Sequence, residues 1–496
     1  MKGCRINRFR GASKLLAVFV VLLMILSLGW TSAVTEAAVV SGVYSFGGGG
    51  YGQLGHGDRS GKAVPTRIED LEDVRSVAAG WRHSLVLLQN GDVYSFGEVG
   101  DGQLGLGEKE ERYVLEPEKI AGISNAKDVI AGRFHSFILL ENGDLYGFGS
   151  NWAGQLGVGD QEDKLTPTRV VGLSNVQKVA AGETHTLALL ENGDVYAFGG
   201  RSGGVLGLGY DTPQYVTTPT RIPFPDKARD VAANMQHSLV VLDNGDVYSF
   251  GHSGDGKLGI LDPPGRTTFD TPQKVEGLGP AKTVATGVLH SLVLLENGDL
   301  YTFGRNYYGE LGLGDTEDRS FPTKVEALSG VAEVVDVTYG AFSLVQLENG
   351  DLYNFGRGDF NQLGHGDGEH KTNPTLIEAF QGSNVLDFAA GESHSLVVMH
   401  IPSVGDFPSE LDNMMIIGRI GVSVDLLFQN NELARQKINA ALDEEGVSLT
   451  DIIINFTTAD QLFWLIGRQA PTAGEIASIM DKITGYWCAD GNWMEW

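Results

Sequence analysis

Six histidines occupy equivalent places in a repeated segment of this 496-residue chain, and a ring of histidines is a pattern that could bind metal. Each histidine precedes Ser or Thr and begins an apolar run. In another copy Phe342 takes the same place without disturbing the register, which a metal ligand would not allow. We therefore interpret these histidines as structural, with ring nitrogens bonded to the backbone of a neighbouring turn. The six are His83, His135, His185, His237, His290 and His394.

Residues 47–52 (Gly-Gly-Gly-Gly-Tyr-Gly) have the glycine spacing of a dinucleotide-binding fingerprint and follow a predicted strand. Such a fingerprint binds phosphate only where a helix begins directly after the glycines. Here the next residues are Gln53-Leu54-Gly55, which belong to the repeat. We therefore predict neither a nucleotide nor any other cofactor.

Acidic and histidine-bearing loops are the remaining candidates for chemistry. Residues 365–370 include two histidines, an aspartate and a glutamate, and residues 160–163 and 315–318 are acidic. These residue types are common in solvated turns, and the spacing of a calcium-binding loop is missing. The sequence also lacks a nucleophile elbow and a paired-histidine zinc motif. We predict no catalytic residue and no metal, and we do not expect an enzyme.

The histidines belong to a segment that reads as a tight β-hairpin, as in residues 83–97 (HSLVLLQNGDVYSFG). Two apolar runs flank Asn90-Gly91, a dipeptide that readily adopts a type I′ turn. An isolated hairpin is barely stable in water, so copies of this unit must stack on one another.

The unit recurs seven times between residues 39 and 400. The first copy of its Tyr-x-Phe-Gly strand lacks a preceding His-Ser strand, and the last His-Ser strand lacks a Tyr-x-Phe-Gly strand after it. Joining the two chain ends completes a seventh unit and leaves no open sheet edge. We predict an all-β fold, a seven-bladed β-propeller of about 52-residue repeats closed by pairing of its N- and C-terminal segments. The Tyr-x-Phe-Gly strands begin at Val43, Val93, Leu145, Val195, Val247, Leu300 and Leu352.

Each repeat is long enough for the four strands of a blade. In the second copy we expect strands at residues 74–79, 84–88, 92–96 and 113–120. Residues 85–88 (Leu-Val-Leu-Leu) are apolar on both faces, which is typical of a sheet packed between two neighbours.

The N-terminal residues 1–38 have the basic, apolar and small-residue regions of a secretory signal peptide. The alternative is an uncleaved membrane anchor at residues 15–35, a run of 21 uncharged residues. We expect export, with the protein secreted or at the cell surface. Cys4 and Cys488 are the only cysteines, so no disulfide framework supports the fold.

The repeat stops near residue 400. Residues 401–412 contain two prolines and read as a linker. Beyond them, Thr472 and Glu475 have capping-box spacing, and Ile476, Ile479 and Ile483 follow at helical intervals. We predict that residues 413–496 form a small, mainly helical domain of unknown role.

The formal net charge of −27 at pH 7 argues against a nucleic-acid-binding surface, which would be built from Lys and Arg. The same charge favours repulsion between copies, so we expect a monomer, and it could steer a basic partner. Membrane contact is expected only if the N-terminal segment stays uncleaved.

Positions that differ between the copies are the candidates for recognition. The framework repeats, whereas the two residues before each histidine and the loops after Phe-Gly vary. Aromatic and arginine side chains on rigidly held loops are common anchors of protein interfaces. The predicted partner-binding residues are Trp81, Arg82, Arg133, Phe134, Trp152, Arg201, Tyr307, Tyr308, Arg357 and Phe360.

The repeat resembles that of the regulator of chromosome condensation family. The resemblance rests on Gly-x-x-His-Ser/Thr-Leu, Asn-Gly-Asp-Val-Tyr-x-Phe-Gly, Gly-Gln-Leu-Gly-x-Gly and Pro-Thr-Arg/Lys, and covers about residues 39–400. It implies a seven-bladed propeller whose members mostly bind other proteins. Relatives include an exchange factor for a small GTPase and a plant ultraviolet-B photoreceptor. The even spacing here leaves no room for the insertion that the exchange factor uses, and the photoreceptor's repeated tryptophans are missing.

We therefore expect an exported, non-catalytic module that binds a protein partner through the variable loops of the propeller. Two alternatives come from other classes of protein. One is a regulator of the exchange-factor kind, by family analogy, and the other is an enzyme acting on cell-surface carbohydrate through acidic loops.

Overall fold

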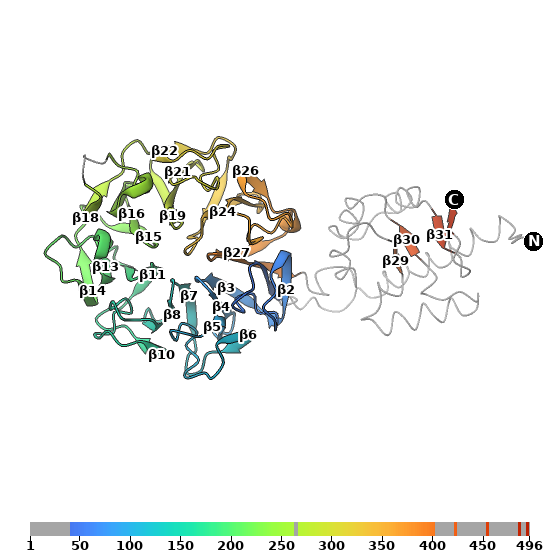
Figure 1. The fold of residues 1–496 in the computed structure, drawn as a ribbon, viewed down its shortest axis with the longest axis horizontal. Helices are drawn as coiled ribbons and strands as arrows, with labels where there is room; N and C mark the ends of the chain where they lie inside the picture. Colours follow the sequence, from blue (N-terminus) through green and yellow to red (C-terminus); the bar gives the residue numbers. More distant parts are fainter. Residues whose placement is uncertain are drawn as a thin grey trace, which may run out of the picture. The chain divides into compact units, whose positions relative to one another are not determined.

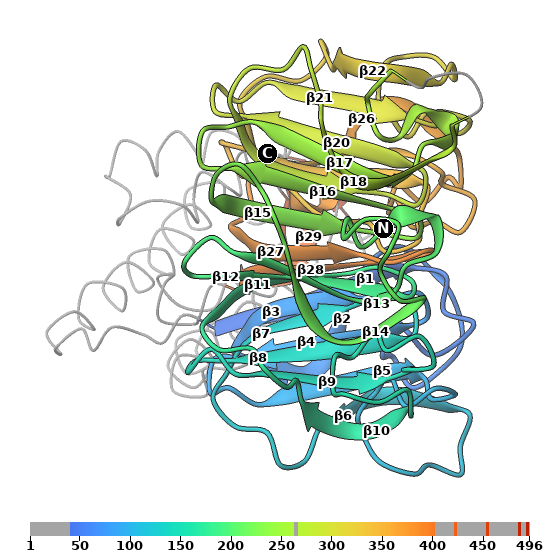
Figure 2. The same ribbon diagram turned by 90° about the vertical axis from the view of Figure 1, so that its left-hand side faces the viewer.

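The computed structural model of the chain describes residues 40–261 and 266–401 and four short strands nearer the C-terminus. Ser41–His400 form one compact unit. Within it, seven antiparallel sheets of four strands surround a central axis (Figure 1). Turned by 90°, the same unit shows loops gathered at the two opposite ends of the strands (Figure 2). The predicted seven-bladed β-propeller is confirmed.

Six blades are continuous in sequence, and each runs from an innermost to an outermost strand. The first blade comprises β3 (Val74–Ala79), β4 (His83–Leu88), β5 (Val93–Glu98) and β6 (Tyr113–Lys119). The second comprises β7 (Ala126–Ala131), β8 (His135–Leu140), β9 (Leu145–Gly149) and β10 (Lys164–Arg169). The third comprises β11 (Val176–Ala181), β12 (His185–Leu190), β13 (Val195–Gly200) and β14 (Tyr215–Ile222). The fourth comprises β15 (Ala228–Ala233), β16 (His237–Leu242), β17 (Val247–His252) and β18 (Thr268–Lys274). The fifth comprises β19 (Ala281–Thr286), β20 (His290–Leu295), β21 (Leu300–Gly304) and β22 (Arg319–Lys324). The sixth comprises β23 (Val331–Val334), β24 (Phe342–Leu347), β25 (Leu352–Gly356) and β26 (Lys371–Leu376). Three short 3₁₀ turns, η1 (Ser202–Gly204), η2 (Gly254–Gly256) and η3 (Glu378–Phe380), lie in the connections.

The seventh blade joins the two ends of the repeat region. Its strand order is β2-β1-β28-β27, in which β1 (Val40–Gly47) and β2 (Lys62–Glu72) come from the start and β27 (Val385–Ala390) and β28 (His394–Ile401) from the end. The ring is therefore closed by pairing of distant segments, as the incomplete first and last copies predict.

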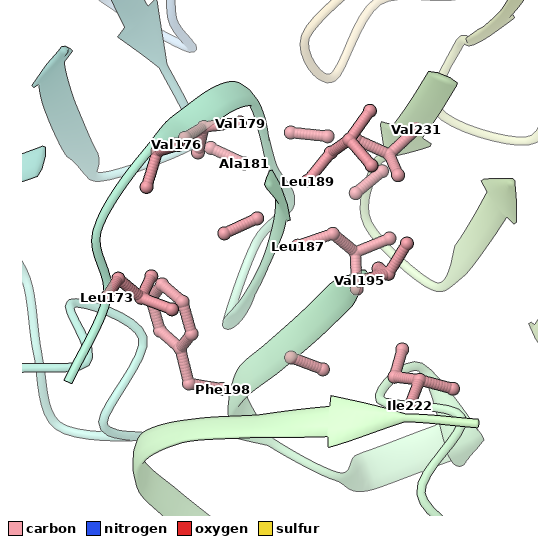
Figure 3. Packing of buried hydrophobic residues seen from close by; sticks show 14 of the residues in the cluster. Leu173, Val176, Val179, Ala181, Leu187, Leu189, Val195, Phe198, Ile222 and Val231 are labelled. Carbon is pink, nitrogen blue, oxygen red and sulfur yellow. The ribbon is translucent and has the colours of Figure 1, made fainter. Parts of the chain in front are cut away.

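The hydrophobic core lies between blades, because each sheet is covered on both faces. Along β4, Val86 packs into the core shared with the seventh blade, and Leu85 and Leu87 pack into the core shared with the second. All three side chains are fully buried. Figure 3 shows the same kind of packing around the third blade, with Leu187 and Leu189 among the labelled residues.

The strands predicted for the second copy match the observed ones closely. The structure places them at β3, β4, β5 and β6, with ends that differ from the predicted ends by two residues at most. The hairpin forms as predicted, with His83 paired to Gly97 across β4 and β5, but its turn is not type I′. Only Gly91 has a positive φ, 82°, whereas a type I′ turn needs a positive φ at Asn90 as well. Gly91 N donates to Leu88 O at 3.0 Å, so the turn is centred one residue earlier, on Gln89 and Asn90.

The six histidines bond from blade to blade. In each, ring Nε2 lies within hydrogen-bond distance of a Ser or Thr hydroxyl on the next blade, and the last bond returns to the first blade. The pairs are His83–Ser136 (2.8 Å), His135–Thr186 (3.3 Å), His185–Ser238 (2.9 Å), His237–Ser291 (2.9 Å), His290–Ser343 (2.9 Å) and His394–Ser84 (3.0 Å). Each histidine therefore bonds to a side-chain hydroxyl through Nε2, whereas the sequence analysis predicts a bond to the backbone of a neighbouring turn.

The hydroxyl orientation assigns the histidine tautomer. Ser136 Oγ donates to the carbonyl oxygen of Gln103 at 2.8 Å, so it accepts from His83, whose Nε2 carries the proton. The imidazole ring of His83 lies directly against the backbone of Gly80, three residues earlier. A Cβ added to Gly80 would lie only 2.2 Å from His83 Cε1. The Gly-x-x-His spacing therefore makes room for the ring.

The sixth blade departs from this pattern. Phe342 keeps the register with the strand that follows, because it pairs with Gly356 as His83 pairs with Gly97. The pairing on its N-terminal side is also kept, since Val331 pairs with Leu347 as Val74 pairs with Leu88. The connection between the two strands is longer, because Val331 and Phe342 are eleven positions apart, whereas Val74 and His83 are nine apart. The register is therefore undisturbed, as the sequence interpretation holds, and the replacement of His by Phe comes with two extra residues in the connection between β23 and β24.

These extra residues form a crossing segment, residues 336–340, which bonds to blades other than its own. Val337 N donates to Thr286 O of the fifth blade at 2.9 Å. Thr338 N donates to Ala390 O of the seventh at 2.8 Å, and Thr338 Oγ1 donates to Ala131 O of the second at 3.3 Å. The segment therefore spans the central axis and ties together blades on different sides of the ring.

Asn234 holds the crossing segment from the fourth blade. It stands where five other blades have glycine, as in Gly80, and it is buried. Its Nδ2 donates to Val337 O at 2.9 Å and to Thr286 O at 3.2 Å. The two exceptions to the repeat, in the fourth and sixth blades, are thus partners in space.

The Asn-Gly-Asp turns are tied to the outermost strands by ion pairs, which explains the Pro-Thr-Arg/Lys motif. In five blades the aspartate of the turn pairs with a basic residue at the end of the fourth strand. The pairs are Asp92–Lys119 (2.6 Å), Asp144–Arg169 (2.6 Å), Asp194–Arg221 (2.6 Å), Asp246–Lys274 (2.9 Å) and Asp299–Lys324 (2.9 Å).

Several predictions concern residues outside the described part of the chain. They are the signal peptide or membrane anchor, the linker and the C-terminal helix predicted after Thr472. What is described beyond residue 401 is two antiparallel pairs, β29 (Gly421–Ser423) with β30 (Ile453–Asn455) and β31 (Gly485–Trp487) with β32 (Trp493–Glu495). In the described residues, no helix has the length and apolar character needed to cross a membrane.

The buried histidines predict loss of stability in acid. Burial lowers the pKa of His83, His135, His185, His290 and His394 to about 3 and that of His237 well below its usual 6.5. The unfolded chain therefore takes up these protons near pH 6.5, and the stability present above that pH is lost as the pH falls. Carboxyls whose pKa is raised by burial act in the opposite sense. Burial raises the pKa of Glu310 and Asp387 to about 7 and that of Asp336 to about 6, and it also raises those of Asp101, Asp128, Glu333 and Glu392.

We expect the six histidines to outweigh the carboxyls, so the free energy of unfolding and the urea midpoint should fall from pH 7 to pH 5. The free energy should fall by roughly 1.4 kcal/mol per pH unit for each net proton that the unfolded chain takes up. Asp387→Asn should make the decline steeper, because it removes a group that takes up a proton in the folded state. Urea titrations at constant ionic strength measure both slopes. A midpoint that is unchanged or higher at pH 5 contradicts this account.

Asn234→Gly restores the residue of the other copies and should still destabilise the protein. It removes the 2.9 Å bond to Val337 O and leaves that buried carbonyl only the longer bond from Gly340 N at 3.4 Å, at a cost of about 1–3 kcal/mol. Urea unfolding of the variant beside the wild type measures the difference. Equal or greater stability of the variant would show that Asn234 does not hold the crossing segment.

Candidate partner-binding face

All ten predicted partner-binding residues lie at one end of the strands. The Gly-x-x-His segments precede the second strand of each blade and the variable loops follow the third. Because these strands are antiparallel, with His83 opposite Gly97, both sets of loops emerge on the same face. A backbone bond from Glu98 N to Arg82 O at 2.9 Å ties one set to the other.

Four of the ten residues come together near the axis and form, with Tyr339, what we call the mouth cluster: Trp81, Arg82, Arg133, Phe134 and Tyr339. The Trp81 and Phe134 rings meet edge to face, with centroids 5.0 Å apart. The Tyr339 ring lies 6.0 Å from Trp81. All five side chains are half-buried, so the cluster is ordered and can still be reached from the face.

The two arginines of the mouth cluster stack on its rings. The Arg82 guanidinium carbon lies 3.5 Å from the Trp81 ring centroid and 3.9 Å from that of Tyr51. That of Arg133 lies 4.5 Å from Trp81, 4.6 Å from Phe134 and 4.1 Å from Tyr339. Such cation–π contacts hold flexible side chains in place before any partner arrives.

Carboxylates neutralise these arginines at their edges. Arg133 forms an ion pair with Glu183 of the third blade, and Arg82 lies 3.4 Å from a carboxylate oxygen of Glu98. Burial raises the pKa of Glu392, whereas neighbouring Trp81 and Arg82 lower it. Burial, followed by the charge of Glu183, raises the pKa of Tyr339. The cluster therefore offers rings and guanidinium planes rather than a strong positive field.

Tyr339 is the residue of this site that the sequence analysis missed. Its φ of 66° is unusual for a bulky residue, and Arg133, Trp81 and the crossing segment keep it there. The signal in the sequence was the longer connection in the sixth blade, which has two residues more before Phe342 than the other blades have before their histidines. Only the folded ring shows that this extra length reaches across to the first and second blades.

Four more predicted residues form a second group farther out, on the loops of the fifth and sixth blades: Tyr307, Tyr308, Arg357 and Phe360. The two tyrosine rings are 4.8 Å apart. The guanidinium of Arg357 lies 5.3 Å from Tyr308 and 4.7 Å from Phe360. Tyr307 is 63% exposed and Phe360 42%, so this outer aromatic group presents apolar surface to solvent.

The last two predicted residues stand apart from both groups. Trp152 is 53% exposed and packs edge to face on Tyr215 of the same face at 6.2 Å. Arg201 stacks on Tyr210, 5.1 Å from its ring centroid. The structure thus gives these two residues local partners and does not bring them into the mouth cluster.

The motifs considered for metal or cofactor binding are occupied by structural contacts. His365 Nε2 lies 2.8 Å from Asn354 Oδ1, and His370 Nδ1 accepts from Gly358 N at 3.1 Å. After residues 47–52 the chain continues through turns and then β2, with no helix. In the described ranges no group of three or more His, Cys, Asp or Glu side chains is placed to hold a metal ion.

Comparison with known proteins agrees with this architecture. A protein-family model, the RCC1-like domain, matches residues 26–278 and 174–405. The ultraviolet-B receptor UVR8 of Arabidopsis thaliana is 32% identical over 440 residues, which cover 86% of this chain and 83% of the receptor. The probable E3 ubiquitin-protein ligase HERC3 of Homo sapiens is 41% identical over 298 residues, 59% of this chain but only 28% of the ligase.

Solved structures show the same fold. The crystal structure of human WBSCR16 superposes with a TM-score of 0.65 at 22% identity, covering 72% of this chain and 99% of that one. Yeast RCC1 (Prp20), solved bound to Kap60, gives a TM-score of 0.65 at 22% identity over 73% of this chain and 90% of its own. The family model, the receptor and the closed seven-bladed ring agree, and the chain belongs to the RCC1-like domain family.

Proposed function

We propose that this protein is an exported, non-catalytic recognition module that acts as a monomer and binds a protein partner through the mouth cluster. The observation that carries the proposal is the convergence of Trp81, Phe134 and Arg133 on one accessible spot, stacked and held before binding. Tryptophan, tyrosine and arginine residues that are ordered in advance are the usual energetic centres of interfaces, because little entropy is lost when they bind.

The scaffold supports this role. The residues of the cluster stand directly before buried strands that are bonded from blade to blade by the histidines, so the loops move little relative to one another. The outer aromatic group lies on the same face and supplies a second apolar contact for a large partner.

Family membership is consistent with binding as the main activity. One solved relative, yeast RCC1, was crystallised with the protein Kap60 bound. The match to HERC3 covers 28% of that ligase, so its ligase activity does not carry over to this chain. Export rests on the signal-peptide pattern of residues 1–38 alone.

The test is affinity capture from the extracellular fraction with the full chain, followed by measurement of the dissociation constant of the captured protein. We expect Trp81→Ala and Phe134→Ala each to weaken binding by roughly 30-fold, the effect of removing an interface anchor worth about 2 kcal/mol. Arg169→Ala is the matched control, because Arg169 lies at the opposite end of the strands and its pair with Asp144 is exposed. It should leave binding unchanged.

Urea midpoints of all three variants show whether any loss comes from unfolding. Binding that depends on Arg169 and not on Trp81 would move the interface to the opposite face. Binding that survives both mouth variants would reject the mouth cluster as the contact.

A further inference from the structure

Three rings of the mouth cluster surround a single cation. The guanidinium of Arg133 lies within 4.1 to 4.6 Å of the centroids of Trp81, Phe134 and Tyr339. We call these three rings the aromatic cage. Rings that meet a cation with their faces form a binding site for organic cations, and here the protein supplies the cation itself.

The surroundings of the cage suit a positive ligand. Glu183 pairs with the caged guanidinium, and Glu392 lies close enough to both Arg133 and Tyr339 to act on their charges. The chain as a whole carries a formal charge of −27, so it attracts basic partners over a distance and repels acidic ones. Both the local carboxylates and the overall charge therefore favour a cationic side chain.

The walls of the cage are fixed independently of Arg133. Trp81 stands two residues before His83, and Phe134 stands one residue before His135. Both histidines are buried and bonded to the next blade. Tyr339 is carried by the crossing segment, whose bonds run to Thr286, Ala390 and Asn234. A cage built this way should keep its shape when its occupant leaves.

We propose that the aromatic cage is the binding site for an arginine side chain of a basic partner protein, and that Arg133 fills the cage in the free protein until the partner's arginine displaces it. This inference rests on the proposed function, because it names the chemistry of the partner that docks on the mouth cluster. The exchange is feasible because Arg133 has a long flexible side chain, 19% exposed, that can swing into solvent.

The energetics make Arg133 a built-in competitor. An incoming guanidinium regains the three ring contacts and the pair with Glu183 that Arg133 gives up, so the exchange is nearly balanced at the cage itself. A tethered competitor acts at an effective concentration of about millimolar or higher. The cage therefore contributes most when other contacts of the partner have already brought its arginine close, which favours an extended basic interface over a free amino acid.

The test uses the full chain and two short peptides, acetyl-Gly-Gly-Arg-Gly-Gly-amide and the same peptide with Gln in place of Arg. Binding is followed by tryptophan emission, with the signal of Trp81→Phe subtracted. We expect Arg133→Ala to bind the arginine peptide at least tenfold more tightly than the wild type does, because the competitor is gone. The glutamine peptide should gain nothing.

Two matched variants separate an emptied cage from a disturbed one. Arg133→Lys keeps a cation in the cage and should bind like the wild type. Arg133→Gln removes the charge but keeps a long polar side chain, so it serves if the alanine variant folds poorly. Adding Tyr339→Ala to Arg133→Ala removes one wall of the cage and should reverse the gain.

Equal binding of both peptides to Arg133→Ala, or binding of neither, overturns the inference. If binding of the captured partner still depends on Trp81 but the arginine peptide does not bind Arg133→Ala, the inference fails and the proposed function stands. It falls with the proposed function if partner binding is independent of Trp81 as well.

Discussion

The bond between a buried histidine and the hydroxyl of the next blade is the interaction on which the rest of this structure depends. Each blade carries a buried Ser or Thr directly after the histidine position, where two blades meet. Nε2 of each histidine reaches across that contact, and the accepting hydroxyl in turn donates a hydrogen bond to a backbone carbonyl, as from Ser136 to Gln103. Because His394 bonds back to Ser84, the same contact also closes the ring between the chain ends.

The single blade without this histidine is where the protein departs from a plain scaffold. Phe342 fills the place of the ring but donates no bond, and the two extra residues before it let the chain cross the axis. Hydrogen bonds from Val337 and Thr338 to other blades, and from Asn234 to the crossing segment, link the blades in another way. The same segment delivers Tyr339 to the mouth cluster, so an exception in the scaffold becomes part of the candidate site.

Much of the fold was predictable because the repeat is written in local chemistry. Asn-Gly turns, apolar strands and incomplete end copies were enough to predict the number of blades and the closure. The identity of the histidine partner was not, since Ser136 is 53 positions from His83 and belongs to another blade. Likewise, the ten variable residues were recognised as a set, but their division into a mouth cluster, an outer aromatic group and two separate residues follows from distances between blades.

The sequence by itself determined the architecture of this protein. Strands with apolar residues on both faces must pack between neighbouring sheets, and seven repeats with an incomplete copy at each end must close into a ring. Only the tertiary structure decided which side chains meet. Arg133 and Trp81 are 52 positions apart in the chain, and Tyr339 is more than 200 positions from either, yet ring closure and the crossing segment bring them to one cage. Contacts of that kind arise from the geometry of the closed ring, which no local pattern encodes.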